Sequence, residues 1–251
     1  AGYTYSDYAR RGFSELVLAA FLNLGLILAL GHWGRHEETH QRVAFDGLSA
    51  SLVAMLAVTL ASALMRLLLY ENAYGFTRLR TYTHFFIFWL GALLVAFAVL
   101  LFRDRLRAFA PASVAAGFGF VATLGLINMD GFIAARNLER LRETGDLDVP
   151  YLASLTGDAI PALTRSVDEP SPPDLLAHLA CQRAVLETWL SESSWQSYHL
   201  GRQSAANSLA GIREFLEPYH VRQEQMSWYV EGPDGDEILC PGQMLGLSEW
   251  A

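Results

Sequence analysis

The sequence predicts an all-α membrane protein: four transmembrane helices followed by a mostly helical, acidic C-terminal tail with a small hairpin. The chain has 251 residues, of which 52% are hydrophobic and 18% charged, and its mean hydropathy is +0.23. Long apolar runs lie within residues 1–128, which carry 10 Arg and 7 acidic residues. Residues 129–251 are polar and carry 8 Arg and 19 acidic residues. We therefore expect a transmembrane region over 1–128 and a polar tail over 129–251.

Four apolar runs are close to the length that crosses a bilayer, about 17–25 residues. They cover about residues 13–31, 48–70, 83–102 and 111–128. The fourth is short and rich in Gly and Ala, which suits close contact with another helix. None carries the polar stripe of a soluble amphipathic helix, so a buried bundle in a soluble protein is disfavoured.

Four spans place both ends of the chain on one side of the membrane. That side collects eight arginines, counting Arg66 at the end of the second span, and the other side collects five. The positive-inside rule then favours a cytoplasmic N-terminus, middle loop and tail in a multi-pass membrane protein. The chain opens with Ala1 and has no n-region ahead of a short apolar h-region, so no signal peptide is predicted.

The tail shows helix and hairpin patterns. Helices are predicted over 130–143, 171–191 and about 194–217. The second starts at Ser171-Pro-Pro-Asp174, with a capping serine and proline in the first turn. Two short runs, 226–231 and 237–240, flank a Gly-Pro-Asp-Gly-Asp segment and are typical of a small hairpin.

The two cysteines, Cys181 and Cys240, both lie in the tail. Two cysteines in a chain of this length are weak grounds for a disulfide, and Cys181 falls within a helical apolar pattern. The sequence therefore favours a buried free thiol at Cys181, with a disulfide as the alternative.

Polar and aromatic residues gather in segment 62–88, where the second span ends and the third begins. In an up-down arrangement this segment shares one membrane face with the start of the first span and the end of the fourth. An ordinary interfacial belt of Tyr, Trp and Arg explains only part of this set. We predict a polar-face cluster that binds an anionic headgroup, a carboxylate-bearing ligand or the tail's own helices. Its members are Glu15, Arg66, Tyr70, Glu71, Asn72, Tyr74, Thr77, Arg78, Arg80, Asn128, Asp130 and Arg136.

Two members of this cluster are charges inside apolar spans, where an ion needs a partner. We predict that Glu15 contacts Arg66, or failing that, that Arg66 contacts Glu71. A salt bridge that only joins two helices is the preferred interpretation. A transport or binding role and an Arg66 side chain that reaches water are the alternatives.

Three histidines, His32, His36 and His40, recur every four residues and would form a stripe on a helix, as zinc ligands can. Gly31 and Gly34 weaken a helix there and no orienting group is evident, so no metal is predicted. The chain has no Gly-x-Ser-x-Gly, His-Glu-x-x-His, Cys-x-x-Cys or phosphate-binding glycine-rich motif. We name no catalytic residue and expect no cofactor, and a non-enzymatic protein is favoured.

Three stretches of the chain resemble a family of bacterial integral membrane proteins classed as domain of unknown function 4153 or 4173. They are Tyr5–Leu16 (YSDYARRGFSEL), Arg66–Tyr82 (RLLLYENAYGFTRLRTY) and Ile127–Arg140 (INMDGFIAARNLER). The resemblance covers roughly residues 3–165. It implies a multi-pass protein of a bacterial inner (cytoplasmic) membrane with further helices upstream, and it brings no activity. The family pattern has Asn-Pro-Asp where this chain has Asn128-Met129-Asp130.

Two functions fit these patterns. The first is a membrane subunit or scaffold that lies in the lipid bilayer and associates with other membrane protein chains in a larger assembly. The second is a transporter or a lipid- or ligand-sensing module that uses the polar-face cluster. A membrane enzyme would need a base and a nucleophile in one cleft, and no such pair stands out. The acidic tail argues against a nucleic-acid partner.

Overall fold

The protein is described here by a computed structural model. It describes the backbone of residues 5–33, 39–167, 171–192, 199–225 and 227–240, and the side chains of 17–31, 40–167, 171–191, 199–225 and 227–240. The chain forms two compact units. Unit 1 comprises residues 1–74 and 79–126, and unit 2 comprises residues 75–78 and 127–251. The short turn at 75–78 therefore belongs to unit 2, although the helices on either side of it belong to unit 1.

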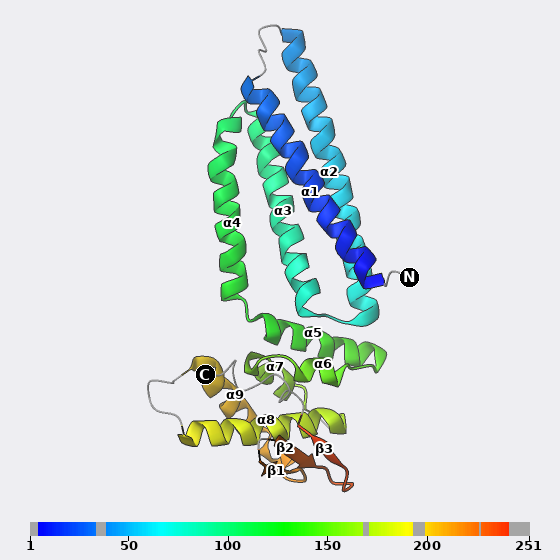
Figure 1. Ribbon diagram of the computed structural model, residues 1–251, viewed down its shortest axis with the longest axis vertical. Coiled ribbons are helices and arrows are strands. Elements are labelled where there is room, and N and C mark those ends of the chain that lie inside the picture. The colour runs from blue at the N-terminus through cyan, green and yellow to red at the C-terminus, as the bar shows by residue number, and fades with distance from the viewer. Residues whose placement is uncertain (1–4, 34–38, 168–170, 193–198, 226, 241–251) are drawn as a thin grey trace. The chain divides into compact units, whose positions relative to one another are not determined.

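Unit 1 consists of long apolar helices that run up and down side by side (Figure 1). They are α1 (Tyr5–Trp33), α2 (Thr39–Tyr74), α3 (Arg78–Phe102) and α4 (Phe109–Leu126), and the 3-10 turn η1 (Leu106–Ala108) precedes α4. The helices α1 and α2 extend past both ends of their apolar runs, and α3 and α4 begin before theirs, because helical structure continues into the flanking polar sequence. Gly75, with φ of 76°, follows the last residue of α2. The turn is thus only Gly75–Thr77, shorter than the 71–82 interval between the second and third predicted spans.

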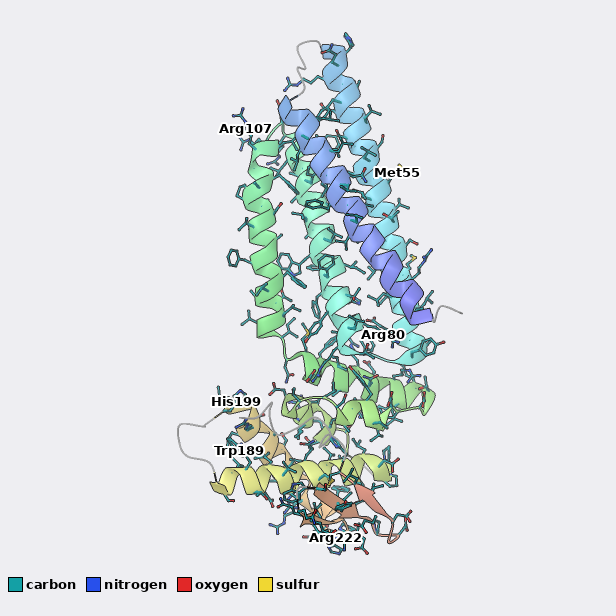
Figure 2. All side chains as sticks on the ribbon, in the orientation of Figure 1. Met55, Arg80, Arg107, Trp189, His199 and Arg222 are labelled. Carbon is teal, nitrogen blue, oxygen red and sulfur yellow. A yellow bond between two sulfur atoms is a disulfide. The ribbon has the colours of Figure 1, made fainter. Side chains whose placement is uncertain are left out.

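A narrow apolar core joins the helices of unit 1. Ile27 of α1, Leu60 of α2 and Phe97 of α3 are each at most 8% exposed. Other large apolar side chains face outward, among them Met55 on α2, which is 67% exposed (Figure 2). Such a surface is unfavourable in water and suits a lipid environment.

Within the described residues, three segments are long and apolar enough to cross a membrane. They are His40–Tyr74, Arg78–Phe102 and Leu106–Leu126. The described side chains of α1 contribute a shorter apolar stretch, Val17–Gly31. These segments correspond to the second, third and fourth predicted spans, and the first predicted span stays a prediction.

Unit 2 is mainly helical and has its own apolar core. Its helices are α5 (Met129–Thr144), α6 (Val149–Ala153), η2 (Gly157–Ala159), α7 (Ile160–Thr164), α8 (Pro173–Glu192), α9 (Leu200–Gly211) and α10 (Arg213–Leu216). Ile133, Leu163, Leu179 and Leu209 pack at the centre and are at most 1% exposed. The predicted helices over 130–143 and 171–191 are confirmed as α5 and α8.

The prediction of one continuous helix over 194–217 is wrong, because the helix is interrupted in its second half. The backbone leaves helical geometry at Ile212, with φ of −111° and ψ of 21°, so α9 and α10 are separate helices. Gly211, a poor helix former, stands immediately before the break. Residues 193–198 lie outside the described residues.

A three-stranded antiparallel sheet of order β1-β2-β3 lies near the end of unit 2. Its strands are β1 (His220–Glu224), β2 (Ser227–Glu231) and β3 (Glu237–Leu239). Val230 lies opposite Val221 on one side and Ile238 on the other, and its buried side chain joins the core. The sequence predicted a two-stranded hairpin and missed β1, because HVRQE is polar and mostly exposed and lacks apolar alternation. Met226, the first residue of the predicted hairpin, lies outside the described residues.

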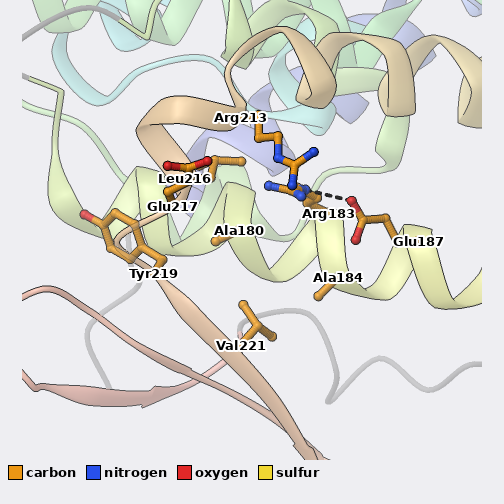
Figure 3. Close-up of a pocket in the computed structure, with 9 residues that line it drawn as sticks. All are labelled: Ala180, Arg183, Ala184, Glu187, Arg213, Leu216, Glu217, Tyr219 and Val221. Atoms are coloured by element: carbon orange, nitrogen blue, oxygen red, sulfur yellow. Dashed lines mark hydrogen bonds and ion pairs between the residues drawn. The ribbon is translucent and has the colours of Figure 1, made fainter.

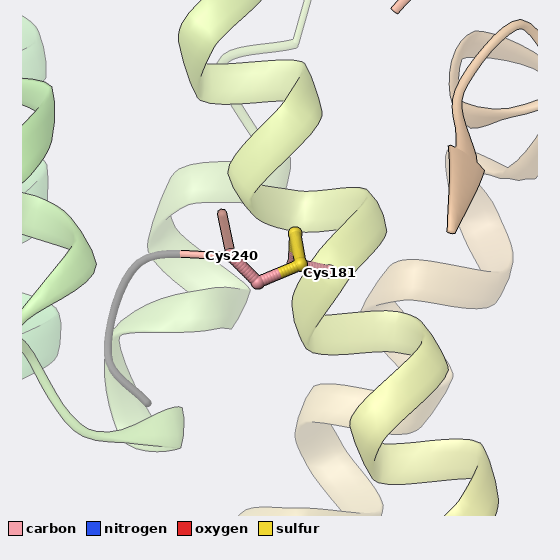
Figure 4. The surroundings of a disulfide bond; sticks show 2 residues. All are labelled: Cys181 and Cys240. Carbon is pink, nitrogen blue, oxygen red and sulfur yellow. A yellow bond between two sulfur atoms is a disulfide. The ribbon is translucent and has the colours of Figure 1, made fainter. Parts of the chain in front are cut away.

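Cys181 of α8 and Cys240, which follows β3, form a disulfide (Figure 4). The free-thiol interpretation is therefore wrong. The partners are 59 residues apart, and only the packing of the sheet on α8 brings them together. Both are 2% exposed, so the bond joins α8 to the sheet inside the core.

Candidate functional site

The turn between α2 and α3 is held inside unit 2 by side chains of α5 and α6. Asn137 donates through Nδ2 to the Phe76 carbonyl over 2.9 Å, and its Oδ1 accepts from the Phe76 N–H over 3.0 Å. The Tyr151 hydroxyl oxygen accepts from the Arg78 backbone N–H over 2.7 Å. Side chains thus satisfy backbone groups that an irregular segment cannot pair by itself. We call Gly75–Arg78, Asp130, Asn137, Tyr151 and Thr156 the turn clamp.

Gly75 fits the clamp for two reasons. Its φ of 76° lies in the left-handed region, which side chains disfavour. A Cβ at this position would also lie 2.5 Å from the Asn137 Oδ1. The absence of a side chain therefore lets Asn137 approach the turn closely enough to bind its backbone.

Arg78 and Asp130 form the charged part of the clamp. Arg78 donates from Nε to Asp130 Oδ1 over 2.8 Å and from Nη2 to Oδ2 over 2.6 Å. The Thr156 N–H and hydroxyl also donate to Asp130 Oδ2, over 2.8 and 2.7 Å. A carboxylate offers about four acceptor sites. Asp130 therefore receives four hydrogen bonds, one on Oδ1 and three on Oδ2, and is held firmly between Arg78 and Thr156.

The electrostatics of Asp130 agree with this geometry. Asp130 is 7% exposed, and burial alone would raise its pKa. The hydrogen bonds from Arg78 and Thr156 outweigh burial and hold the pKa below the ordinary value of an aspartate. The group is thus a stable carboxylate and a poor proton donor.

Asn128 starts α5 and so sets the position of Asp130. Its Oδ1 accepts from the Gly131 N–H over 2.8 Å, which caps the helix, and its Nδ2 donates to the Asp158 carbonyl over 2.8 Å. Met129 occupies the first helical position, where proline would also fit. The departure from Asn-Pro-Asp therefore leaves the helix start intact.

Glu71, one of the two predicted partners of Arg66, lies beside His84 instead. Glu71 is 1% exposed and lies 3.4 Å from His84 Nδ1. Arg66 is exposed and forms no ion pair with any side chain that the structure describes, so the expected Arg66–Glu71 contact is wrong. The Glu15 side chain lies outside the described residues, and its contact with Arg66 stays a prediction.

Three further members of the predicted cluster pack together at the ends of α2 and α3. The Tyr70 and Tyr74 rings lie 5.5 Å apart, and the Arg80 guanidinium carbon lies 5.8 and 5.9 Å from their centroids. Figure 2 labels Arg80 near the start of α3. This cation–π arrangement suits the interfacial belt of a membrane protein.

The last three members of the predicted cluster differ in where they lie. Asn72 is exposed, and Thr77 is a partly buried residue of the clamp turn. Arg136 is exposed, binds Glu139 over 2.7 Å and lies 5.4 Å from the Phe132 ring centroid. Arg78 and Asp130 of the predicted cluster thus meet in the hydrogen-bond network of the turn clamp.

Sequence reasoning did not assign Tyr151 and Thr156 to this site. Thr156 precedes Gly157-Asp158 and reads as a helix cap, but its hydroxyl donates to Asp130. Tyr151 lies in the short helix α6 and gives no signal of its own. Both reach the site through tertiary packing.

The structure does not test the histidine stripe as a metal site. The side chains of His32 and His36 lie outside the described residues, and His40 is exposed. No group of three His, Cys, Asp or Glu side chains among the described residues is placed to hold a metal ion.

Helices of this length and hydropathy, with large apolar side chains facing outward, are typical of integral membrane proteins. The chain belongs to the family described as Domain of unknown function (DUF4153), whose family model matches residues 1–166. No curated protein and no solved structure matches the chain. The matched region contains the whole turn clamp and ends just after α7, so α8 to β3 lie beyond it.

Proposed function

We propose that this protein is a non-enzymatic scaffold of a bacterial inner membrane. Four transmembrane helices would anchor its polar domain and contact other membrane protein chains in a larger assembly. The observation that carries this proposal is the turn clamp, in which Arg78 and Asp130 bind each other and hold the turn in unit 2.

The clamp supports a structural role through its connections. Unit 2 contains the turn between α2 and α3, and α5 follows α4 directly. The chain therefore passes between the units at 74–75, 78–79 and 126–127. The chain therefore connects the polar domain to the end of α2, the start of α3 and the end of α4, as an anchoring module requires.

The surface of α4 supports contact with another chain. Only 6% of its apolar segment is buried, against 17% for α2 and 22% for α3. Its exposed positions include Ala115, Gly117, Ala122 and Gly125, and nothing lies within 4 Å of the Cβ positions of the two glycines. Small residues allow a second helix to approach closely, and they offer lipid little apolar surface.

The test is purification of the full chain from its own membranes in a mild detergent, followed by native mass spectrometry. We expect a complex larger than one protomer. Gly117→Leu with Gly125→Leu should release the partner, because bulky side chains block close helix contact. Gly25→Leu on α1 is the matched control, since its Cβ position is also open. A monodisperse single protomer would overturn the proposal.

A second candidate is a transporter or a lipid- or ligand-sensing module, and the buried Glu71 favours it. Ionisable residues at the ends of apolar spans often mark a ligand or proton pathway, and Glu71 lies beside His84. Arg66→Ala should then abolish ligand binding or flux in proteoliposomes while the protein stays folded. Loss of folding instead would assign Arg66 a structural role.

For the orientation we propose a cytoplasmic N-terminus and tail, which the arginine balance supports. The Cys181–Cys240 disulfide weighs against it, because the cytosol keeps most thiols reduced. Acid quenching of intact cells, followed by maleimide labelling of the unfolded chain, distinguishes a cytoplasmic tail from a tail on the opposite side of the membrane. Free thiols at both positions are expected for a cytoplasmic tail. An oxidised pair in cells would place the tail on the opposite side.

A further inference from the structure

A pocket of about 250 Å³ lies in unit 2 between α8, α10 and β1 (Figure 3). None of its residues belongs to the turn clamp. Its floor is apolar and includes Ala180, Leu216 and Val221. Its rim is polar and includes Arg183, Arg213 and Tyr219. A drug-sized ligand needs about 300–1,000 Å³, so this pocket suits a smaller molecule.

Two arginines meet at one end of the pocket. Figure 3 shows the guanidinium groups of Arg183 and Arg213 pointing toward each other. Arg183 donates from Nε to Glu187 Oε1 over 2.7 Å, and this pair leaves its terminal nitrogens facing Arg213. Among the described residues Arg213 has no ion-pair or hydrogen-bond partner. Like charges repel, and an anion between them would convert the repulsion into attraction.

The other end of the pocket is acidic and would reject a second anionic group. Glu217 and Tyr219 line it. Burial raises the pKa of Tyr219, and the nearby Asp234 and Asp174 raise it further. Its hydroxyl therefore stays protonated and neutral. A ligand with one negative head at the arginines and an apolar body over the floor would match both ends.

We propose that this pocket binds a small aliphatic monocarboxylate through Arg183 and Arg213. A planar carboxylate matches the paired donors of guanidinium groups. Because Glu187 offsets one of the two arginine charges, the rim complements a single negative charge better than two. The inference is independent of the scaffold proposal: a lone protomer that binds the ligand would overturn the scaffold and leave the pocket assignment standing.

The test titrates the full chain, in a neutral detergent, with hexanoate by isothermal calorimetry. Two further probes separate the parts of the ligand: hexanol keeps the apolar body without the charge, and inorganic phosphate keeps an oxyanion without the body. We expect saturable hexanoate binding and at least about tenfold weaker binding of both others. No saturable hexanoate binding, or equal binding of hexanol, would overturn the proposal. Equal binding of phosphate would overturn the assignment of a carboxylate with an apolar body.

Single-residue variants test whether hexanoate binds in this pocket. Arg213→Gln should weaken hexanoate binding at least about tenfold, because it removes an unpaired charge at the rim. Arg142→Gln, on exposed α5 surface, removes the same charge from unit 2 without touching the pocket and should leave the affinity unchanged. Arg213 is exposed, so its replacement should not unfold the chain, and circular dichroism checks this. Equal weakening by both variants would contradict the site.

Discussion

The helices of unit 1 and those of unit 2 differ in where their large apolar side chains lie. In unit 1, Phe118 is 74% exposed and Leu126 is 86% exposed. In unit 2, Ile133 and Leu179 are fully buried. Lipid gives no hydrophobic drive for helices to associate, so close side-chain packing, including contacts at small residues, has to hold unit 1 together. Water supplies that drive to unit 2, where a core, the turn clamp and a disulfide add to one another.

The largest effect should come from removing the disulfide of unit 2. Cys181→Ala with Cys240→Ala should lower the free energy of unfolding of unit 2 by about 4 kcal/mol, because the bond closes a loop of 59 residues. Hydrogen exchange with mass spectrometry should show faster exchange in α8 and the sheet, and unchanged exchange in α2 and α3. Reduction of the wild-type chain is the control and should act the same way. Equal loss of protection in both units would contradict the comparison.

The second effect is a pH dependence specific to unit 2. His178 of α8 is 2% exposed, and burial lowers its pKa from 6.5 to about 4. The unfolded chain gains a proton here as the pH falls below 6.5, while the native chain gains it only near 4. As far as His178 is concerned, the free energy of unfolding therefore has its full value above pH 6.5. It falls by about 3 kcal/mol as the pH drops to 4. Urea unfolding between pH 4 and 7 measures this slope.

His178→Leu is the variant that isolates this effect. The His178 Nδ1 has no hydrogen-bond partner within the described residues, so an apolar replacement leaves no new buried group unpaired. We expect the variant to lose most of the slope between pH 6.5 and 4. Asp130 does not interfere, because its pKa is lowered and its stabilising contribution is lost only at more acidic pH. An unchanged slope would assign the pH dependence to other groups.

A third, smaller effect tests the turn clamp. Gly75→Ala should cost about 2 kcal/mol, from the left-handed backbone and from displacement of Asn137. Gly145→Ala is a matched control, because Gly145 ends α5 with φ of 74° and has nothing within 4 Å of its Cβ position. Gly145→Ala should lower the free energy of unfolding only through the left-handed backbone, by about 1 kcal/mol. Thermal unfolding of unit 2 compares the two, and equal costs would mean that the Asn137 contact contributes nothing.

The same contrast explains what the sequence could predict. Local patterns were sufficient for α5 and α8, because apolar spacing and the Pro-Pro-Asp start act within a few residues. The cluster prediction contained both Arg78 and Asp130, but their pairing joins positions 52 residues apart. Tertiary packing alone decides such a contact. The disulfide and the exposed strand β1 were missed for the same reason.

The smallest effect concerns unit 1, where α4 meets α3. A Cβ on Gly119 would lie 2.2 Å from the nearest atom of the Trp89 ring, whose Nε1 donates to Thr123 Oγ1 over 3.2 Å. Gly119→Ala should therefore displace Trp89. The gain in helix propensity, about 1 kcal/mol, offsets part of this cost, so we expect a net loss of about 1 kcal/mol.

Gly117→Ala serves as the control because nothing lies within 4 Å of its Cβ position. It should receive the propensity gain without a clash and should leave unit 1 unchanged or slightly more stable. Thermal unfolding in detergent with tryptophan fluorescence measures both variants. If the two variants change the thermal stability of unit 1 equally, close contact at Gly119 does not hold α4 against α3. Packing at small residues then does not stabilise unit 1 at this site.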